Sequence, residues 1–200
     1  MKAVILLLLP LLLAPLPPES TRKTVPDADD AHLRHAIRHR CVLGCIWAYR
    51  DHKRPDSGDT EAQIKTCSER CFDAEAIESA LAFRPAASWG TTKKEAIEVC
   101  LPAGEHYFIE DLRCPDGKRP TYHRIGSMGP RNPYPKDGDV PLLMDFTKPL
   151  EPGQVDYHIV DKYEIDCPGG KKHILYFDMY HCTGPKPWAA PAGFSRPVRR

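Results

Sequence analysis

The longest apolar run of the chain lies at its N-terminus. Residues 3–16 (AVILLLLPLLLAPL) carry no charge and follow the short basic start Met1-Lys2. A membrane-spanning helix needs about 20 apolar residues, and a shorter run after a basic start is typical of a signal peptide. The pattern therefore predicts a signal peptide over residues 1–18, and an uncleaved N-terminal anchor is the alternative. We expect a secreted or periplasmic protein with no membrane attachment after cleavage.

The next segments have the polar and apolar spacing of helices. The pattern predicts, in chain order, a linker, a helix, a turn and a second helix, at residues 19–28, 29–50, 51–58 and 59–83. The two helices are expected to form an antiparallel helical hairpin over 29–87. A short third helix is predicted over 92–100, where Thr92 and Glu95 resemble a capping box.

After Pro102 the pattern changes to that of strands, with aromatic and β-branched residues between turns that contain Pro and Gly. Two strand pairs are predicted, each around a Cys-Pro-X-Gly-Lys turn: 105–113 with 119–127, and 156–166 with 172–181. They would form an antiparallel β domain over 92–182 with a long Pro-rich loop at 128–155. The predicted fold class is α+β: a disulfide-stapled antiparallel helical hairpin followed by a small antiparallel β-sheet of two hairpins.

Composition narrows the class of protein. Hydrophobic residues make up 42% and charged residues 28%, and the net charge is +1. These values exclude a disordered polyelectrolyte and argue against a dedicated nucleic-acid-binding protein, which needs a basic excess. Residues 183–200 hold basic residues and no acid, so they are predicted to be a disordered basic tail.

Eight cysteines, an even number, predict a disulfide framework in an exported chain. Cys41 and Cys45 share one face of the first helix, and Cys67 and Cys71 share one face of the second, because positions i and i+4 are helix neighbours. Antiparallel packing then predicts the bonds Cys41–Cys71 and Cys45–Cys67, with a structural zinc site as the alternative. Over residues 30–83 the arrangement resembles in shape the stapled helical hairpins of plant α-hairpinins and coiled-coil-helix-coiled-coil-helix proteins. The resemblance implies a shared stabilising device, with no toxin or mitochondrial role.

The distance that a strand spans limits which of the other four cysteines can bond to each other. A ten-residue strand spans about 33 Å, whereas the Cα atoms of a disulfide lie about 4.4–6.8 Å apart. Cys167 and Cys182, at opposite ends of one predicted strand, therefore cannot bond to each other. Side-by-side hairpins place Cys114 and Cys167 at the turn edge and Cys100 and Cys182 at the open edge. We expect Cys114–Cys167 and Cys100–Cys182, although four cysteines allow three connectivities.

Candidate metal ligands occur on the first predicted helix. His32, His35 and His39 are spaced to lie on one face, away from the cysteines. Imidazole binds Zn²⁺ and Cu²⁺, so a surface metal site is one interpretation. A solvated polar face that includes the neighbouring arginines is the alternative, and no cofactor is expected.

Candidate catalytic residues occur on the predicted second hairpin. His158, Glu164, His173 and His181 could form the acid/base set of a small secreted hydrolase, such as a nuclease. The alternative is that they are hydrogen-bonded structural residues. The chain lacks Gly-x-Ser-x-Gly, His-Glu-x-x-His and a Cys-x-x-Cys redox motif.

The Pro-rich loop supplies candidate binding residues, Arg131, Asn132 and Tyr134, because loops often carry binding side chains. An ordered connection without a ligand is the alternative. Since stabilising devices are plentiful and catalytic motifs are missing, we favour an exported, disulfide-rich, non-enzymatic protein that binds another protein or a surface. A nuclease-like hydrolase and a periplasmic metal-binding protein are the alternatives. A nucleic-acid partner is expected only for the nuclease.

Overall fold

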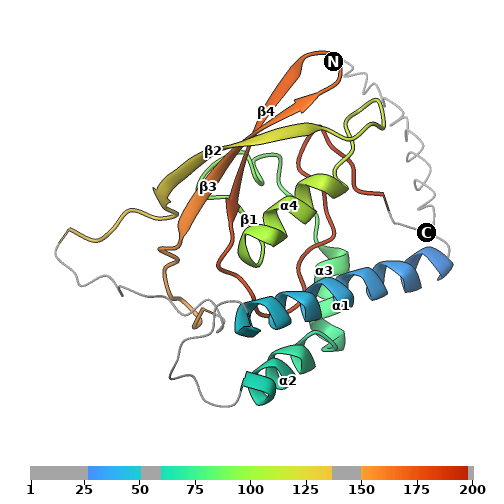
Figure 1. Ribbon diagram of the computed structural model, residues 1–200, viewed down its shortest axis with the longest axis vertical. Helices are drawn as coiled ribbons and strands as arrows, with labels where there is room; N and C mark the ends of the chain where they lie inside the picture. Colours follow the sequence, from blue (N-terminus) through green and yellow to red (C-terminus); the bar gives the residue numbers. More distant parts are fainter. Residues whose placement is uncertain (1–26, 51–59, 137–149, 198–200) are drawn as a thin grey trace, which may run out of the picture.

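A computed structural model describes residues 27–50, 60–136 and 150–197. Figure 1 shows a sheet with α4 lying against it, and a layer made by the first three helices. The described elements are α1 (Asp27–Arg50), α2 (Thr60–Arg70), α3 (Ala74–Ala82), β1 (Ile97–Glu98), α4 (Leu101–Asp111), β2 (Thr121–Pro130), β3 (Ile159–Cys167) and β4 (Lys171–Asp178). The α+β class is therefore confirmed. The predicted signal peptide, 1–18, lies outside the described residues.

The sheet has the strand order β1-β4-β3-β2. β2, β3 and β4 pair antiparallel, as expected, and the short β1 pairs parallel with β4, so the sheet is mixed. One face of the sheet packs against α4. The core there consists of Phe108 and Ile109 from α4 and Leu112 just after it, with Tyr163, Ile165, Leu175 and Phe177 from the sheet. β2 forms an edge and contains two register irregularities, which twist an edge away from further pairing.

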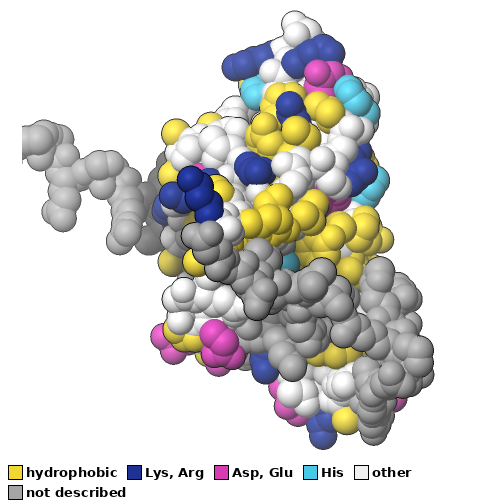
Figure 2. Space-filling model, turned by 90° about the vertical axis from the view of Figure 1, so that its left-hand side faces the viewer, with side chains coloured by type: hydrophobic (Ala, Val, Ile, Leu, Met, Phe, Trp, Pro, Cys, Tyr) yellow, Lys and Arg dark blue, Asp and Glu magenta, His cyan; other side chains and the backbone are white. Residues whose placement is uncertain are grey.

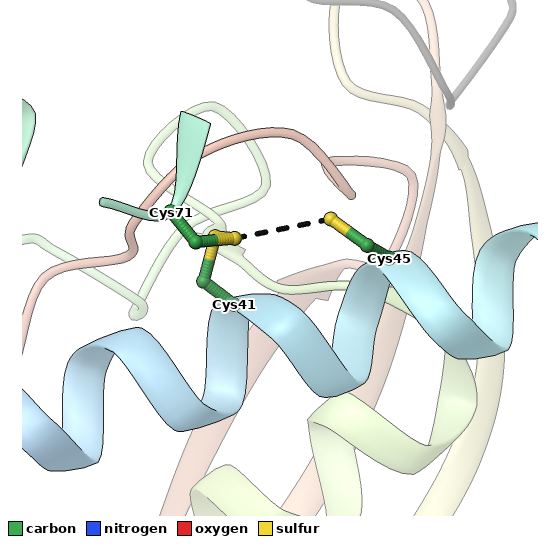
Figure 3. Close-up of side chains that lie close together, drawn as sticks. All are labelled: Cys41, Cys45 and Cys71. Carbon is green, nitrogen blue, oxygen red and sulfur yellow. Dashed lines mark hydrogen bonds between the residues drawn. A yellow bond between two sulfur atoms is a disulfide. The ribbon is translucent and has the colours of Figure 1, made fainter. Parts of the chain in front are cut away.

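The eight cysteines form the four predicted disulfides: Cys41–Cys71, Cys45–Cys67, Cys100–Cys182 and Cys114–Cys167. The two helical bonds lie against each other, with Cys45 Sγ 3.8 Å from Cys71 Sγ (Figure 3).

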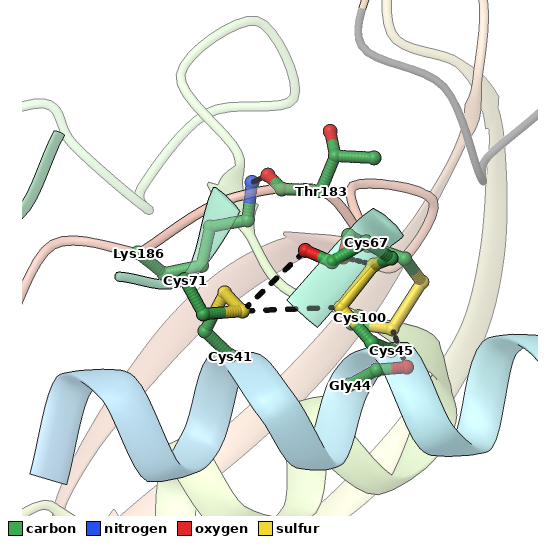
Figure 4. The surroundings of a disulfide bond; sticks show 9 residues. Cys41, Gly44, Cys45, Cys67, Cys71, Cys100, Thr183 and Lys186 are labelled. Carbon is green, nitrogen blue, oxygen red and sulfur yellow. Dashed lines mark hydrogen bonds between the residues drawn. A yellow bond between two sulfur atoms is a disulfide. The ribbon is translucent and has the colours of Figure 1, made fainter. Parts of the chain in front are cut away.

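The Cys100–Cys182 bond links the segments that follow β1 and β4, and it packs against the two helical disulfides. Cys100 Sγ lies 3.5 Å from the Gly44 carbonyl oxygen of α1, and Cys67 Sγ lies 3.9 Å from the Cys182 carbonyl oxygen (Figure 4). Three disulfides thus gather where the helical layer meets the sheet.

One predicted strand is wrong. Residues 105–113 do not form a strand, because α4 occupies Leu101–Asp111. Its buried residues include Leu101, Glu105, Phe108 and Ile109, which follow helical spacing. The aromatic residues favoured a strand, but this periodicity and Pro102 in the first turn favour a helix. The first predicted hairpin is therefore a helix followed by a strand.

The predicted helix at 92–100 is also absent. The Thr92 hydroxyl accepts the expected hydrogen bond from the Glu95 backbone N–H at 3.2 Å. The chain nevertheless turns back, because the Gly90 N–H donates to the Glu95 carbonyl oxygen, and β1 follows at Ile97–Glu98. The capping pattern thus marks a turn. The second predicted helix, 59–83, is interrupted after Arg70, and Asp73 caps α3 by accepting from the Ala76 N–H at 2.7 Å.

The predicted disordered tail is wrong over residues 183–197, which pack on the domain. Arg196 lies between Phe108 and Trp188, with its guanidinium carbon 4.3 Å and 4.2 Å from the two ring centroids. Phe194 contacts His173, with ring centroids 4.7 Å apart. The basic composition of this segment predicts disorder, but its aromatic residues Trp188 and Phe194 make the contacts that hold it on the domain. The predicted loop 128–155 begins later than expected, because β2 continues to Pro130, and 137–149 lie outside the described residues.

Candidate functional site

A cleft of about 780 Å³ lies between α1, α4, β1 and the C-terminal segment. Its aromatic lining includes Trp47 of α1 and Tyr107 of α4, whose rings stack with centroids 5.4 Å apart. Glu98, Arg131 and His181 line it on the side of the sheet. The volume lies in the range of small-ligand pockets, about 300–1,000 Å³.

The three histidines of α1 also line this cleft. His32, His35 and His39 are exposed, and the rings of His35 and His39 stack with centroids 6.1 Å apart. Among the described residues, the groups that bring three or more potential metal ligands together include none of these three. The predicted α1 metal site is therefore not assembled, and the histidines form part of a cleft wall.

A buried charged cluster lies beside the cleft, at the end of the sheet where β2 and β4 finish and β3 begins. Its members are Asp156, His158, Asp178 and His181. The sheet register holds Asp178 opposite Val160 of β3 and beside Glu98 of β1. The Arg131 N–H donates to the His158 carbonyl oxygen, which holds the segment after β2 against the segment before β3.

The two aspartates lie between the two histidines. His181 Nε2 lies 3.1 Å from Asp156 Oδ2 and 3.2 Å from Asp178 Oδ2. His158 Nδ1 lies 3.0 Å from Asp156 Oδ1 and 3.6 Å from Asp178 Oδ1. The structure thus brings together two of the four predicted catalytic residues, with two aspartates that the sequence analysis did not single out.

Arg131 and Glu98 complete the cluster on the cleft side. Arg131 Nη1 lies 2.8 Å from Glu98 Oε1 and 3.0 Å from Asp156 Oδ2. Asn132 donates from Nδ2 to the Asp156 carbonyl oxygen at 2.7 Å. Two of the three predicted binding residues therefore make internal contacts.

These contacts shift the acid–base properties of the cluster. Burial opposes the charge of His181, but its hydrogen bond to Asp156 and its close contacts with the carboxylates of Asp178 and Glu98 raise its pKa to about 9. Burial alone would raise the pKa of Asp156, but contacts with His158 and His181 hold that pKa below its ordinary value. Burial alone would raise the pKa of Glu98, but the nearby His181, Lys186 and Arg131 hold that pKa below its ordinary value.

The other two predicted catalytic residues lie elsewhere. Glu164 pairs with Lys172, whose Nζ is 2.6 Å from Glu164 Oε1. His173 contacts Phe194, and burial followed by nearby Lys171 lowers its pKa. Because the four residues do not meet around one cleft, the structure does not assemble the acid/base set of the nuclease hypothesis.

Tyr134, the third predicted binding residue, is exposed, with 48% of its surface accessible, and lies near Tyr157, with ring centroids 5.6 Å apart. Other large apolar side chains are exposed as well: Phe72, Tyr107, Ile125, Met128 and Val155. Figure 2 shows hydrophobic side chains gathered across the middle of one face. Exposed apolar surface is thus present both in the cleft and outside it.

A second buried network lies between α4 and the sheet. The Tyr163 hydroxyl donates to Glu105 Oε2 at 2.7 Å. On the same side of the sheet, Arg124 donates to both oxygens of the buried Asp161, each at 2.8 Å. Burial raises the pKa of Glu105 to about 7; the Tyr163 hydrogen bond opposes this rise, and Asp161 adds to it. In the sequence, the sign of this buried network is Glu105 itself, a glutamate at a position that helical spacing assigns to the apolar face of α4.

No protein-family model, curated protein or solved structure gives a significant match to this chain. Within the described residues, none of the helices combines the length and apolar character needed to span a membrane.

Proposed function

We propose that this protein is an exported, non-enzymatic binding protein that holds an apolar segment of a partner protein in the cleft between α1 and α4. The observation that carries the proposal is the cleft itself, which has a suitable volume and aromatic walls on a frame braced by three adjacent disulfides. Complete pairing of the cysteines supports an oxidising compartment.

The chemistry of the walls favours an apolar occupant. Tyr107 has 45% of its surface accessible and stacks on Trp47, so an incoming side chain can pack on the exposed ring. Several charged groups of the wall already contact an opposite charge: Arg40 and Arg196 both contact Asp111, and Arg131 pairs with Glu98. Recognition would therefore rest on apolar contact, with the α1 histidines as adaptable polar contacts.

A titration with the apolar fluorophore 8-anilinonaphthalene-1-sulfonate tests this site. We expect one saturable binding site, quenching of tryptophan fluorescence, and at least tenfold weaker binding for Trp47→Ala and Tyr107→Ala. Tyr134→Ala removes a similarly exposed ring outside the cleft lining and serves as the matched control. Equal binding by all variants with native near-ultraviolet circular dichroism would contradict the proposal, as would no saturable binding by the parent protein.

A further inference from the structure

The charged cluster at the end of the sheet has the composition of a metal site. Within the described residues, three groups bring at least three potential ligands together. The sulfur atoms of Cys41, Cys45 and Cys71 are bonded in disulfides, so they cannot bind a metal as thiolates. Glu164 of a second group is bound by Lys172. The remaining group, Asp156, His158, Asp178 and His181, offers two imidazoles and two carboxylates whose ligand atoms all lie within 4.8 Å of one another.

The spacing of these atoms fits a tetrahedral ion. Bonds of 2.0–2.1 Å from a tetrahedral Zn²⁺ place neighbouring ligand atoms about 3.3 Å apart. His158 Nδ1 lies 3.0 and 3.6 Å from the Oδ1 atoms of Asp156 and Asp178, and His181 Nε2 lies 3.1 and 3.2 Å from their Oδ2 atoms. The carboxylates would therefore turn on binding, so that one oxygen of each faces the ion together with both imidazoles.

Unpartnered atoms point to the same place. His158 is 8% exposed, and within the described residues its Nε2 has no hydrogen-bond partner, while its Nδ1 lies 3.0 Å from Asp156 Oδ1 without the alignment of a hydrogen bond. Asp178 is completely buried, and its Oδ2 lies 3.2 Å from His181 Nε2, again without the alignment of a hydrogen bond. Buried polar atoms in proteins are normally hydrogen-bonded or bound to an ion. A cation between these atoms would satisfy His158 and Asp178 together.

The surrounding contacts are those of an outer shell. Metal-binding histidines usually direct their second ring nitrogen at a carboxylate or carbonyl group. His181 Nδ1 lies 3.5 Å from Glu98 Oε2. Asp156 Oδ1 accepts from the His158 backbone N–H at 3.0 Å, and Asp178 Oδ1 accepts from the Tyr180 N–H at 3.2 Å, so both carboxylates are already oriented.

The charge of the cluster also favours a cation. Asp156, Asp178 and Glu98 supply three negative charges, and Arg131 and Lys186 supply two positive charges beside them. With both histidines neutral, the set carries a net negative charge that attracts a cation. Glu98, Arg131 and His181 line the cleft, which gives an entry path.

We propose that Asp156, His158, Asp178 and His181 bind one divalent transition-metal ion, with Zn²⁺ favoured by the two imidazole and two carboxylate ligands. Four protein ligands make a closed, structural site. The ion would fasten the segment before β3 to the end of β4 and so stabilise the sheet side of the cleft. The inference stands independently of the binding function.

Calorimetry on the full-length, EDTA-treated and dialysed protein tests the site, with Zn²⁺, Co²⁺, Mg²⁺ and Ca²⁺ added separately. We expect one equivalent of Zn²⁺, and a rise in melting temperature of about 5–10 °C at a Zn²⁺ concentration near 100 times Kd. Bound Co²⁺ should show the visible spectrum of four-coordinate nitrogen and oxygen ligation. Mg²⁺ and Ca²⁺, which prefer more oxygen ligands, should not produce these effects.

The variants separate this cluster from the α1 histidines. His158→Gln and Asp178→Asn should abolish binding, whereas a His32→Ala, His35→Ala and His39→Ala triple variant should retain it. Glu98→Gln, at a partly exposed position, should fold normally and weaken Zn²⁺ binding about 10–100-fold, which covers the case in which the buried variants misfold. Loss of binding in the triple variant alone, equal binding of Mg²⁺ or Ca²⁺, or no Zn²⁺ binding by the parent protein would each overturn the proposal.

Discussion

Replacement of Glu105 by glutamine should make the protein more stable at neutral and alkaline pH. Glu105 is 1% exposed, and its Oε1 has no hydrogen bond within the described residues. Burial raises its pKa from the ordinary value of 4.5 to about 7. The folded state therefore holds the proton more tightly than the unfolded state does.

The direction and size of this stability difference follow from proton linkage. The stabilising effect of the proton is complete below pH 4.5, is lost as the pH rises through 7, and changes no further above that. The difference between 4.5 and about 7 corresponds to roughly 3 kcal/mol at most, at 1.36 kcal/mol per pH unit. Glutamine cannot ionise and can still accept the Tyr163 hydrogen bond. We therefore expect Glu105→Gln to match the parent protein near pH 4 and to exceed it by about 1–3 kcal/mol at pH 8.

Urea unfolding at several pH values between 4 and 8, without reductant and followed by tryptophan fluorescence, measures this difference. Glu110→Gln, at an exposed position on the same helix, is the matched control and should show no such gain. Parallel stability curves for Glu105→Gln and the parent protein between pH 4.5 and 7 would refute the reasoning.

Three further perturbations have expected outcomes. Arg196→Ala should lower the free energy of unfolding by about 3 kcal/mol, because it leaves buried Asp111 with one fewer partner, and Arg196→Lys should lower it less. Proteolysis should cleave residues 183–197 faster in the alanine variant, and an unchanged cleavage rate would contradict the packing of this segment. Replacing Cys114 and Cys167 together by alanine should lower the free energy of unfolding by about 2–5 kcal/mol; an unchanged denaturation midpoint would contradict a stabilising role. Asp73→Ala should cost about 1 kcal/mol by removing the α3 cap, while Asp73→Asn should restore most of it in the same denaturation assay.

The disulfide framework could be predicted because it depends on geometry that spacing determines. Two residues four apart on a helix share a face, so Cys41 and Cys45 match a similarly spaced pair on an antiparallel neighbour. The α4 segment differs from its prediction because aromatic residues favour strands locally, whereas the spacing of Glu105, Phe108 and Ile109 buries one helical face.

The charged cluster could be foreseen only in part. The sequence indicates His158 and His181 as candidates because they are polar residues near predicted strands. Asp156 and Asp178 lie beside them because β3 pairs with β4 and because the Arg131 N–H donates to the His158 carbonyl oxygen. The contact of Glu98 with His181 depends on the parallel pairing of β1, which two residues of sequence do not reveal. Contacts between segments far apart in the chain are set by tertiary packing, and local pattern carries little information about them.

Four disulfides brace the fold, two within the helical layer and two on the sheet side, and they leave no thiol for chemistry. Intact mass after alkylation, with and without prior reduction, tests it directly on the exported protein, and peptide mapping assigns the bonds. We expect no label before reduction, eight labels after it, and a cross-linked peptide that joins Cys100 to Cys182. Free thiols at Cys41, Cys45, Cys67 and Cys71 would contradict it and would favour the cysteine–zinc site.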